Sequence, residues 1–315
     1  MYIVGVDLGG TEIKVGLVDR EKGIVRKVSR ATEVDKGPDK IVENIALAIK
    51  EVAGDDDFEY VGIGSPGSID RKKGIVRFSP NFPDWRDFHL TEKVSELIDK
   101  EIIVENDANA FTLGEWYFGK AKGSQNFIAL TLGTGIGSGV VANGTFITGN
   151  NGIGAELGHI VIVPEGPMCG CGSRGCLESV ASAKFVGLHA RELAPRYPES
   201  LMIKFAGDIN KIESKHVFKA CEENDELAKI VVNETVEVLA RAIGGYVHMF
   251  NPEMIIIGGG MSKAGETLFK PLRERTKKYV MVSFRGTYRI EQSDLVENAG
   301  ILGAASAAIF SKGVE

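Results

Sequence analysis

A strand, a glycine turn and a second strand follow one another twice in this chain, at its start and again after residue 120. In the first copy, residues 2–7 and 13–19 are rich in β-branched side chains and flank a glycine turn at 7–11. In the second copy, residues 127–132 and 138–142 flank a glycine turn at 133–137. Glycine leaves backbone amides uncovered, so both turns could hold phosphate oxygens, although a lone turn of this kind is often only a tight hairpin.

Strands and helices alternate after each copy of the repeat. Apolar spacing predicts helices over 38–52 and 225–250, and the small-residue run 299–310 also reads as a helix. Helical character over 108–118 and short apolar strands at 24–29, 60–64, 102–104 and 254–257 complete the pattern. This alternation predicts an α/β fold. With 315 residues, 43% of them hydrophobic, the chain is long enough for two domains.

The charge balance disfavours two classes of partner. There are 37 basic and 43 acidic side chains, for a net charge of −6. Proteins that bind nucleic acid or anionic membranes usually have a basic surface, so we expect neither partner. The N-terminus has no basic or signal-like stretch, and we expect a cytoplasmic protein without a membrane span.

Three of the four cysteines lie within eight residues, and a histidine precedes them. Together they form the set His159, Cys169, Cys171 and Cys176, whereas Cys221 lies apart in a charged segment. Three thiols and an imidazole make a closed tetrahedral zinc site, which predicts a structural rather than a catalytic Zn²⁺. Glu156 and Glu178 flank this loop and could accept hydrogen bonds from a polyol, or could simply be solvated.

Two aspartates stand where a ligand could reach them. Asp7 adjoins the first glycine turn, where it could hold Mg²⁺ through water or only accept hydrogen bonds from the turn. Asp107 follows a strand and precedes a helix, at the sheet edge where ligands collect in α/β folds. Local sequence favours Asp107 as the N-cap of that helix, a role that does not exclude catalysis.

The order of these motifs resembles the ROK family of sugar kinases and repressors. The resemblance covers essentially the whole chain, and its most discriminating part is the cysteine cluster with the Glu156 and His159 that precede it. It implies two ribonuclease H-like domains of the actin and hexokinase type with an interdomain cleft: 1–118 plus 299–315, and 119–298 with the zinc loop. It also implies ATP-dependent phosphorylation of a hexose, with glucose and its 6-hydroxyl preferred.

The resemblance assigns roles to individual residues. Asp107 would be the general base. Sugar contacts would come from Gly67, Asn81, Asn106, Asp107, Glu156, His159 and Glu178. Phosphate contacts would come from Asp7, Gly9, Gly10, Thr11, Gly133, Thr134, Gly135 and Gly137, with Gly258, Gly259 and Gly260 beside the adenosine. One departure is Glu12, where many members carry Lys.

Several alternatives stay open. The sugar could be mannose, fructose, allose, N-acetylglucosamine or N-acetylmannosamine, because the shared motifs do not report pocket shape, and the donor could be ADP or polyphosphate. A non-catalytic sugar-sensing regulator is less favoured, because the first turn begins at residue 7, with no room for a DNA-binding domain before it. The expected partners are a sugar, a nucleotide and a second copy of the chain in a homodimer or higher homo-oligomer.

Overall fold

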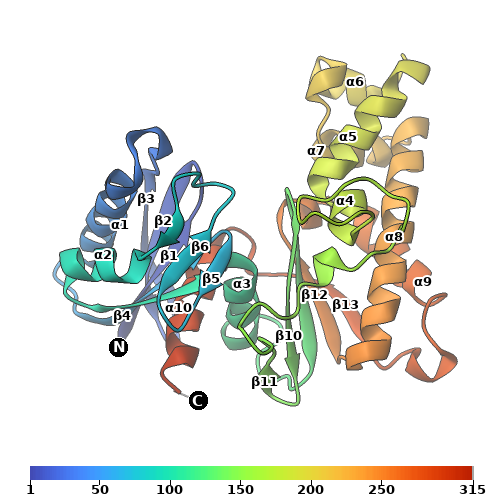
Figure 1. Ribbon diagram of the computed structural model, residues 1–315. Coiled ribbons are helices and arrows are strands. Elements are labelled where there is room, and N and C mark those ends of the chain that lie inside the picture. The colour runs from blue at the N-terminus through green and yellow to red at the C-terminus, as the bar shows by residue number, and fades with distance from the viewer. Residues whose placement is uncertain (314–315) are drawn as a thin grey trace. The chain divides into compact units, whose positions relative to one another are not determined.

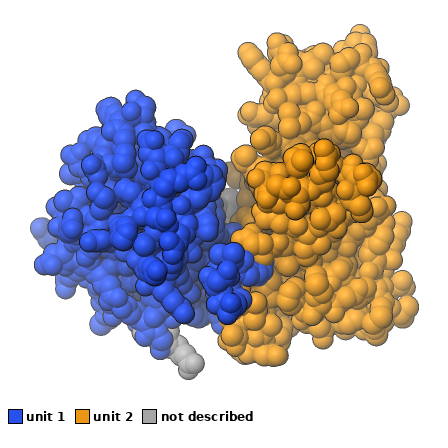
Figure 2. Space-filling view, viewed as in Figure 1, with its two compact units in different colours: residues 1–123, 148–155, 294–315 blue, residues 124–147, 156–293 orange. Residues whose placement is uncertain are grey.

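The chain divides by its internal contacts into two compact units, coloured separately in Figure 2. The computed structural model describes residues 1–313, with the side chain of Val296 left out. Unit 1 comprises residues 1–123, 148–155 and 294–315, and unit 2 comprises residues 124–147 and 156–293. The last helix therefore returns to unit 1, together with the short segment 148–155.

The described part of unit 1, up to residue 313, contains two sheets and four α-helices. The strands of its main sheet are β1 (Tyr2–Leu8), β2 (Glu12–Asp19), β3 (Gly23–Ala31), β4 (Phe58–Ser65) and β8 (Glu101–Asn106). A small second sheet consists of β5 (Ser68–Asp70), β6 (Ile75–Phe78) and β7 (Arg86–Phe88). The helices are α1 (Pro38–Ala53), α2 (Leu90–Ile98), α3 (Asp107–Tyr117) and α10 (Ala299–Ser311).

Helices cover both faces of the main sheet in unit 1 (Figure 1). One face buries Val4 and Val6 against α1 and α2, and the other buries Ile3 against α10. The approach of α10 is very close, because a Cβ atom on Gly62 would lie 1.8 Å from the carbonyl oxygen of Ala304. Glycine in the strand is what lets this helix lie directly on the sheet.

Unit 2 has a five-stranded sheet and six α-helices. Its strands are β9 (Phe127–Leu132), β10 (Ile136–Ala142), β11 (Thr145–Phe146), β12 (Met254–Gly258) and β13 (Arg289–Gln292). Its helices are α4 (Leu177–Ala181), α5 (Ala183–Leu193), α6 (Leu201–Ala206), α7 (Ser214–Glu222), α8 (Glu226–Phe250) and α9 (Glu266–Thr276). The 25-residue helix α8 packs against α4, α5, α7 and α9, and the carboxylate of Asp225, the residue before it, caps its first turn.

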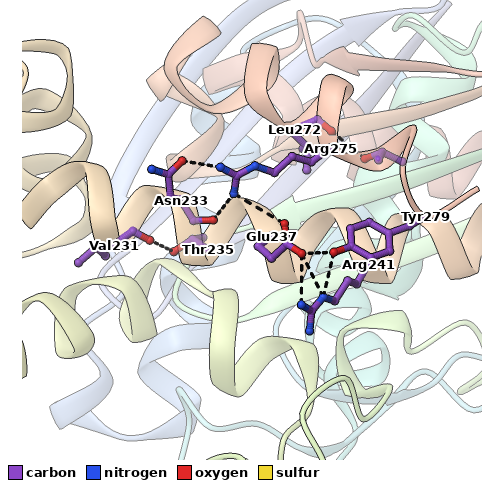
Figure 3. A network of polar contacts seen from close by, with 9 residues as sticks. Val231, Asn233, Thr235, Glu237, Arg241, Leu272, Arg275 and Tyr279 are labelled. Carbon is purple, nitrogen blue, oxygen red and sulfur yellow. Dashed lines mark hydrogen bonds and ion pairs between the residues drawn. The ribbon is translucent and has the colours of Figure 1, made fainter.

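A polar network joins α8 to α9 and to the segment that follows α9 (Figure 3). The guanidinium of Arg275 donates to the side-chain oxygen of Asn233 at 2.6 Å. The carboxylate of Glu237 accepts hydrogen bonds from the Tyr279 hydroxyl and from Arg241. The bond from Tyr279, together with the arginines, lowers the pKa of Glu237 below its ordinary value.

The two main sheets share one strand order. Unit 1 has the order β3-β2-β1-β4-β8 and unit 2 the order β11-β10-β9-β12-β13. In each sheet the first three strands are antiparallel and the last two run parallel to the central strand. The repeat seen in the sequence is therefore a repeat of sheet topology, and the predicted α/β fold class is confirmed.

The predicted strands and helices are confirmed to within two residues at either end. The β5-β6-β7 sheet is not among the predicted elements, because strands of three or four residues are too short for a recognisable alternation. Among the helices of residues 1–313, none combines the length and the apolarity needed to cross a bilayer.

Candidate functional site

The first glycine turn is held by hydrogen bonds from within and from the side. The N–H of Gly9 donates to the carbonyl of Glu12 at 3.0 Å. Thr32, fully buried just after β3, donates from its hydroxyl to the Gly9 carbonyl at 2.7 Å and from its N–H to the Thr11 carbonyl at 2.9 Å. A Cβ atom on Gly10 would lie 3.3 Å from Cβ of Asn81. The structure therefore brings the predicted sugar contact Asn81 to the predicted phosphate turn.

Asp7 lies at the end of β1, beside the first turn of α10. A Cβ atom on Gly300 would lie 2.3 Å from the Asp7 carboxylate, so glycine is required there for the carboxylate to keep its place. Burial raises the pKa of Asp7, and the positive charge of Lys14 partly opposes this. A largely buried carboxylate beside a glycine turn suits a Mg²⁺ ion held through water.

Asp107 begins helix α3 but does not cap it, so the capping role favoured by local sequence is wrong. The N-cap is Asn106, whose Oδ1 accepts hydrogen bonds from the N–H groups of Ala108 at 2.9 Å and Asn109 at 3.2 Å. The extended backbone of Asn106 at the end of β8 makes this geometry available. Asp107 is exposed, and its Oδ1 accepts a local hydrogen bond from the N–H of Ala108 at 2.9 Å. Its carboxylate is therefore accessible to a ligand.

Gly67 fixes Asn106 from the neighbouring segment. The side-chain amide of Asn106 donates to the Gly67 carbonyl at 3.0 Å. Gly67 has φ +110°, and a Cβ atom there would lie 2.1 Å from the carbonyl oxygen of Phe78. No other residue type fits this position, so Gly67 reaches the site through its backbone.

The second glycine turn is braced by Glu178. The N–H of Gly133 donates to the Gly135 carbonyl at 2.9 Å, and the N–H of Ile136 donates to Oε2 of Glu178, also at 2.9 Å. Thr134 is exposed at the tip. Gly259, at φ +82°, packs against Leu132, because a Cβ atom there would lie 2.6 Å from the Leu132 carbonyl oxygen. Within unit 2, the glycines at 133–137 and 258–260 thus meet at the end of β9.

His159 ends a short 3-10 turn, Leu157–His159, and Glu156 precedes it; residues of β10 and α8 hold this turn in place. The N–H of Leu157 donates to the Ser138 hydroxyl at 2.8 Å, and the buried Tyr246 hydroxyl donates to the Leu157 carbonyl at 2.7 Å. Partial desolvation raises the pKa of Glu156, and the like charge of Glu178 adds to this. A carboxylate and an imidazole on a rigid turn suit recognition of sugar hydroxyls.

The histidine and three cysteines come together as predicted from their spacing. Their four potential ligand atoms lie within 4.8 Å of one another, and Nδ1 of His159 is 3.6 Å from Sγ of Cys169. Tetrahedral zinc with sulfur ligands near 2.3 Å needs ligand separations of roughly 4 Å. Burial raises the pKa of Cys169 to about 12, whereas a hydrogen bond from the Ser173 N–H lowers that of Cys171 to about 7. The donor set and its spacing therefore fit Zn²⁺, which binds thiols as thiolates.

A cavity of about 360 Å³ opens in unit 2 beside Gly260, the last residue of the glycine run 258–260. Gly260 and Met261 form one wall, and the other wall comes from α7, with Phe218 and Lys219. The lining combines the apolar side chains of Phe218 and Met261 with three lysines and one glutamate, and apolar walls with nearby cations suit a planar base that carries phosphates.

Three parts of the candidate site are not predicted from the sequence: Thr32, Tyr246 and the wall formed by α7. The Thr32 hydroxyl bonds to the first glycine turn across 23 residues, and the Tyr246 hydroxyl bonds to the 3-10 turn after Glu156 across 89 residues. Nothing in the local sequence marks such long-range partners. The wall of α7 was missed because its sequence is typical of an ordinary amphipathic surface helix.

Known proteins resemble this chain over nearly its whole length. A model of the ROK family matches residues 3–310. The glucokinase of Thermotoga maritima is 54% identical over 97% of this chain and 96% of its own length. The glucokinase of Halalkalibacterium halodurans is 38% identical over 96% of this chain and 93% of its own. A ROK family glucokinase from Streptomyces griseus, solved with glucose and AMPPNP, superposes with a TM-score of 0.85 at 35% identity, covering 97% of this chain and 98% of that one.

These likenesses confirm the two-domain fold of the actin and hexokinase type that the motifs predicted. Because the family model extends over nearly all of the residues that form both units, the chain belongs to the ROK family.

Proposed function

We propose that this protein is an ATP-dependent glucokinase that phosphorylates the 6-hydroxyl of glucose. The observation that carries the proposal is Asp107, an exposed carboxylate at the start of α3 in a chain 54% identical to a glucokinase. An exposed carboxylate next to a firmly held cap can take a proton from a bound hydroxyl.

In the proposed reaction, Asp107 accepts the proton of the 6-hydroxyl while the hydroxyl oxygen forms a bond to the γ-phosphorus. The bond between that phosphorus and the β–γ bridging oxygen breaks, and ADP leaves. Such a transfer depends mainly on positioning and on stabilising charge. The amides of the glycine turns at 7–11 and 133–137 would bind phosphate oxygens, and the cavity beside α7 would take the adenine.

Metal ions have two distinct places in the proposal. Asp7 would hold Mg²⁺, which neutralises charge on the phosphates when bound. His159, Cys169, Cys171 and Cys176 would hold a structural Zn²⁺. Because Nδ1 of His159 faces Cys169, the other ring nitrogen remains for the sugar, alongside Glu156 and Glu178.

The first test is ADP release from Mg²⁺-ATP with glucose, mannose, fructose, allose, N-acetylglucosamine and N-acetylmannosamine. We expect turnover on glucose, and a loss of about 10²–10⁴-fold in kcat for Asp107→Asn with glucose binding retained. Asp55→Asn, at an exposed aspartate of unit 1, is the matched control and should keep full turnover. Preference for an N-acetyl sugar would reassign the substrate, and near-normal turnover of Asp107→Asn would remove it as the base.

The second test is metal analysis of protein purified without chelator. We expect about one zinc per chain, lost in Cys169→Ser together with several degrees of Tm, because a structural zinc contributes folding energy. Cys221→Ser should keep both the zinc and the Tm, since Cys221 lies in α7, outside the cluster. Zinc well below one per chain in the wild type would overturn this assignment.

The remaining expectations concern assembly and location. We expect a homodimer or higher homo-oligomer acting in the cytoplasm. A monomer in sedimentation equilibrium at micromolar concentration would contradict the expected assembly.

A further inference from the structure

Glu105 is a buried carboxylate directly before the Asn106 cap. It is the next-to-last residue of β8 and is only 3% exposed. A charge so deeply buried is costly unless its oxygens are paired. Oε1 accepts hydrogen bonds from the Asn106 N–H at 3.0 Å and from the Asn109 side-chain amide at 2.9 Å. Glu105 therefore binds both the N-cap residue Asn106 and Asn109 in the first turn of α3.

The second oxygen of Glu105 forms an ion pair with an arginine but accepts no hydrogen bond of good geometry. Oε2 is buried and lies 3.3 Å from Nε of Arg71, which follows β5. Arg71 is one-third exposed and lines a cavity of about 1050 Å³ in unit 1. Arg71 thus balances the charge of Glu105 at Oε2, on the solvent side. Oε1 accepts both of the hydrogen bonds that link Glu105 to the start of α3.

Three hydrogen bonds hold Asn106 in addition to the pairing of β8 with β4. Its side-chain amide donates to Gly67, its Oδ1 accepts from the first turn of α3, and its backbone N–H donates to Glu105. The pairing of β8 with β4 holds the backbone through Asn106, and the bond from the Asn106 N–H to Glu105 adds a side-chain contact to the same peptide. Asp107 is the next residue in the chain, so a change in the Asn106 backbone also changes the direction of the Asp107 carboxylate. That direction therefore depends on the bond from the Asn106 N–H to Glu105.

We propose that Glu105 is a positioning residue for phosphoryl transfer, which orients Asp107 by holding Asn106 and Asn109. The proposal rests on the proposed function of Asp107 as the base. Glu105 itself does not touch substrate. Its contribution is the placement of the base, and an error of about 1 Å in such a placement can cost about 10²-fold in rate.

The experiment compares Glu105→Ala, Glu105→Gln and Val104→Ala. Gln keeps an oxygen that can accept both bonds, while Ala removes both. Val104 is buried in the core from the same strand, and its apolar side chain cannot hydrogen-bond the cap, so Val104→Ala is the control for lost stability alone. We expect Glu105→Ala to lower kcat about 10–100-fold with KM for ATP nearly unchanged, Glu105→Gln to recover kcat to within about threefold of the wild type, and Val104→Ala to keep kcat.

A second measurement does not depend on the reaction. The amide hydrogens of Ala108 and Asn109, which donate to Asn106, should exchange faster in Glu105→Ala than in Val104→Ala. If Glu105→Ala does not fold, Glu105→Leu combined with Arg71→Met removes both bonds without leaving an unpaired arginine, and the same loss of kcat is expected.

Two results would overturn the proposal: a wild-type kcat in Glu105→Ala, or an equal loss of kcat in Val104→Ala. A wild-type protein that phosphorylates no sugar would instead refute the proposed function. In that case the exchange rates still decide whether Glu105 holds the cap, and equal rates in the two variants would show that it does not.

Discussion

The two glycine turns occupy the same place in two sheets of the same strand order, yet they differ in length and in support. The first connects Leu8 to Ile13 through residues 9–12, and the second connects Leu132 to Ile136 through residues 133–135. Thr32 supports the first turn with a hydroxyl, and Glu178 supports the second with a carboxylate.

The charge on the strands before the turns also differs. Asp7 is the next-to-last residue of β1, and Thr131 is the next-to-last residue of β9. In unit 1 the carboxylate is in the strand, beside the turn, where it can meet a cation and phosphates. In unit 2 the carboxylate comes from Glu178, two residues after a cysteine of the zinc cluster, and it accepts a bond from the turn itself. Two copies of one backbone motif can therefore differ in chemistry because a few side chains around them differ.

The largest expected effect on kcat is that of Asp7→Asn, and Thr131→Val, at the equivalent position of unit 2, is the variant to compare with it. Removing the carboxylate should lower kcat by about 10²-fold, as loss of a charge-stabilising group does. Thr131→Val should change kcat less than about threefold, because no charge is lost. Steady-state kinetics with Mg²⁺-ATP measure both, and equal losses would mean that the two turns act alike.

The same Asp7→Asn variant should be more stable than the wild type when neither Mg²⁺ nor nucleotide is present. Because the pKa of Asp7 is raised in the folded protein, the folded state binds this proton more tightly than the unfolded state. Stability from this group is therefore greatest below its ordinary pKa of 3.8 and falls as the pH rises through the folded value. At neutral pH the ionised carboxylate costs stability, so we expect Asn to raise the Tm by a few degrees.

A smaller effect is expected from Gly300→Ala, which tests how α10 serves the first turn. The new Cβ atom would lie 2.3 Å from Asp7, so the carboxylate must move. We expect kcat/KM for Mg²⁺-ATP to fall about tenfold, since a misplaced group loses much of its rate contribution. Gly245→Ala is the matched control in helix α8, where no heavy atom lies within 4 Å of the new Cβ. It should keep kcat/KM and gain roughly 0.5–1 kcal/mol of stability, as glycine replaced by alanine in a helix does.

The sequence could predict the parts of the site that are local in the chain. The glycine turns, the cysteine cluster and the strand end before Asp107 each depend on residues within about twenty positions, and their spacing alone indicated them. The N-cap was assigned to Asp107 rather than Asn106 because both residue types cap helices well. Only the backbone at the end of β8 decides between them.

Contacts across the fold could not be predicted in the same way. Gly300 is nearly the whole chain away from Asp7, and only the return of α10 to unit 1 brings them together. Glu105 reads as an ordinary strand-end carboxylate until its burial and its bond to Asn109 are known. Such residues are recognised by packing, for which a single sequence gives no periodic signal.

The smallest effect is expected from Glu237→Gln, which separates the stability of unit 2 from the chemistry of its turn. The carboxylate accepts bonds from Tyr279, in the segment after α9, and from Arg241 in α8 (Figure 3). Because the group is partly solvated, we expect a loss of less than about 1 kcal/mol in the free energy of unfolding, with kcat unchanged. Glu223→Gln, at an exposed glutamate just after α7, is the control and should not alter stability.

The pH dependence of this loss has a definite sign. The pKa of Glu237 is lowered in the folded protein, so its stabilisation is complete above its ordinary pKa of 4.5 and is lost as the pH falls through the folded value. The unfolding curves of the wild type and Glu237→Gln should therefore differ at pH 7 and converge below pH 4.5. A drop in kcat in this variant would mean that the polar network between α8 and α9 also supports the second glycine turn. The stability of unit 2 and the chemistry of its turn could then not be separated.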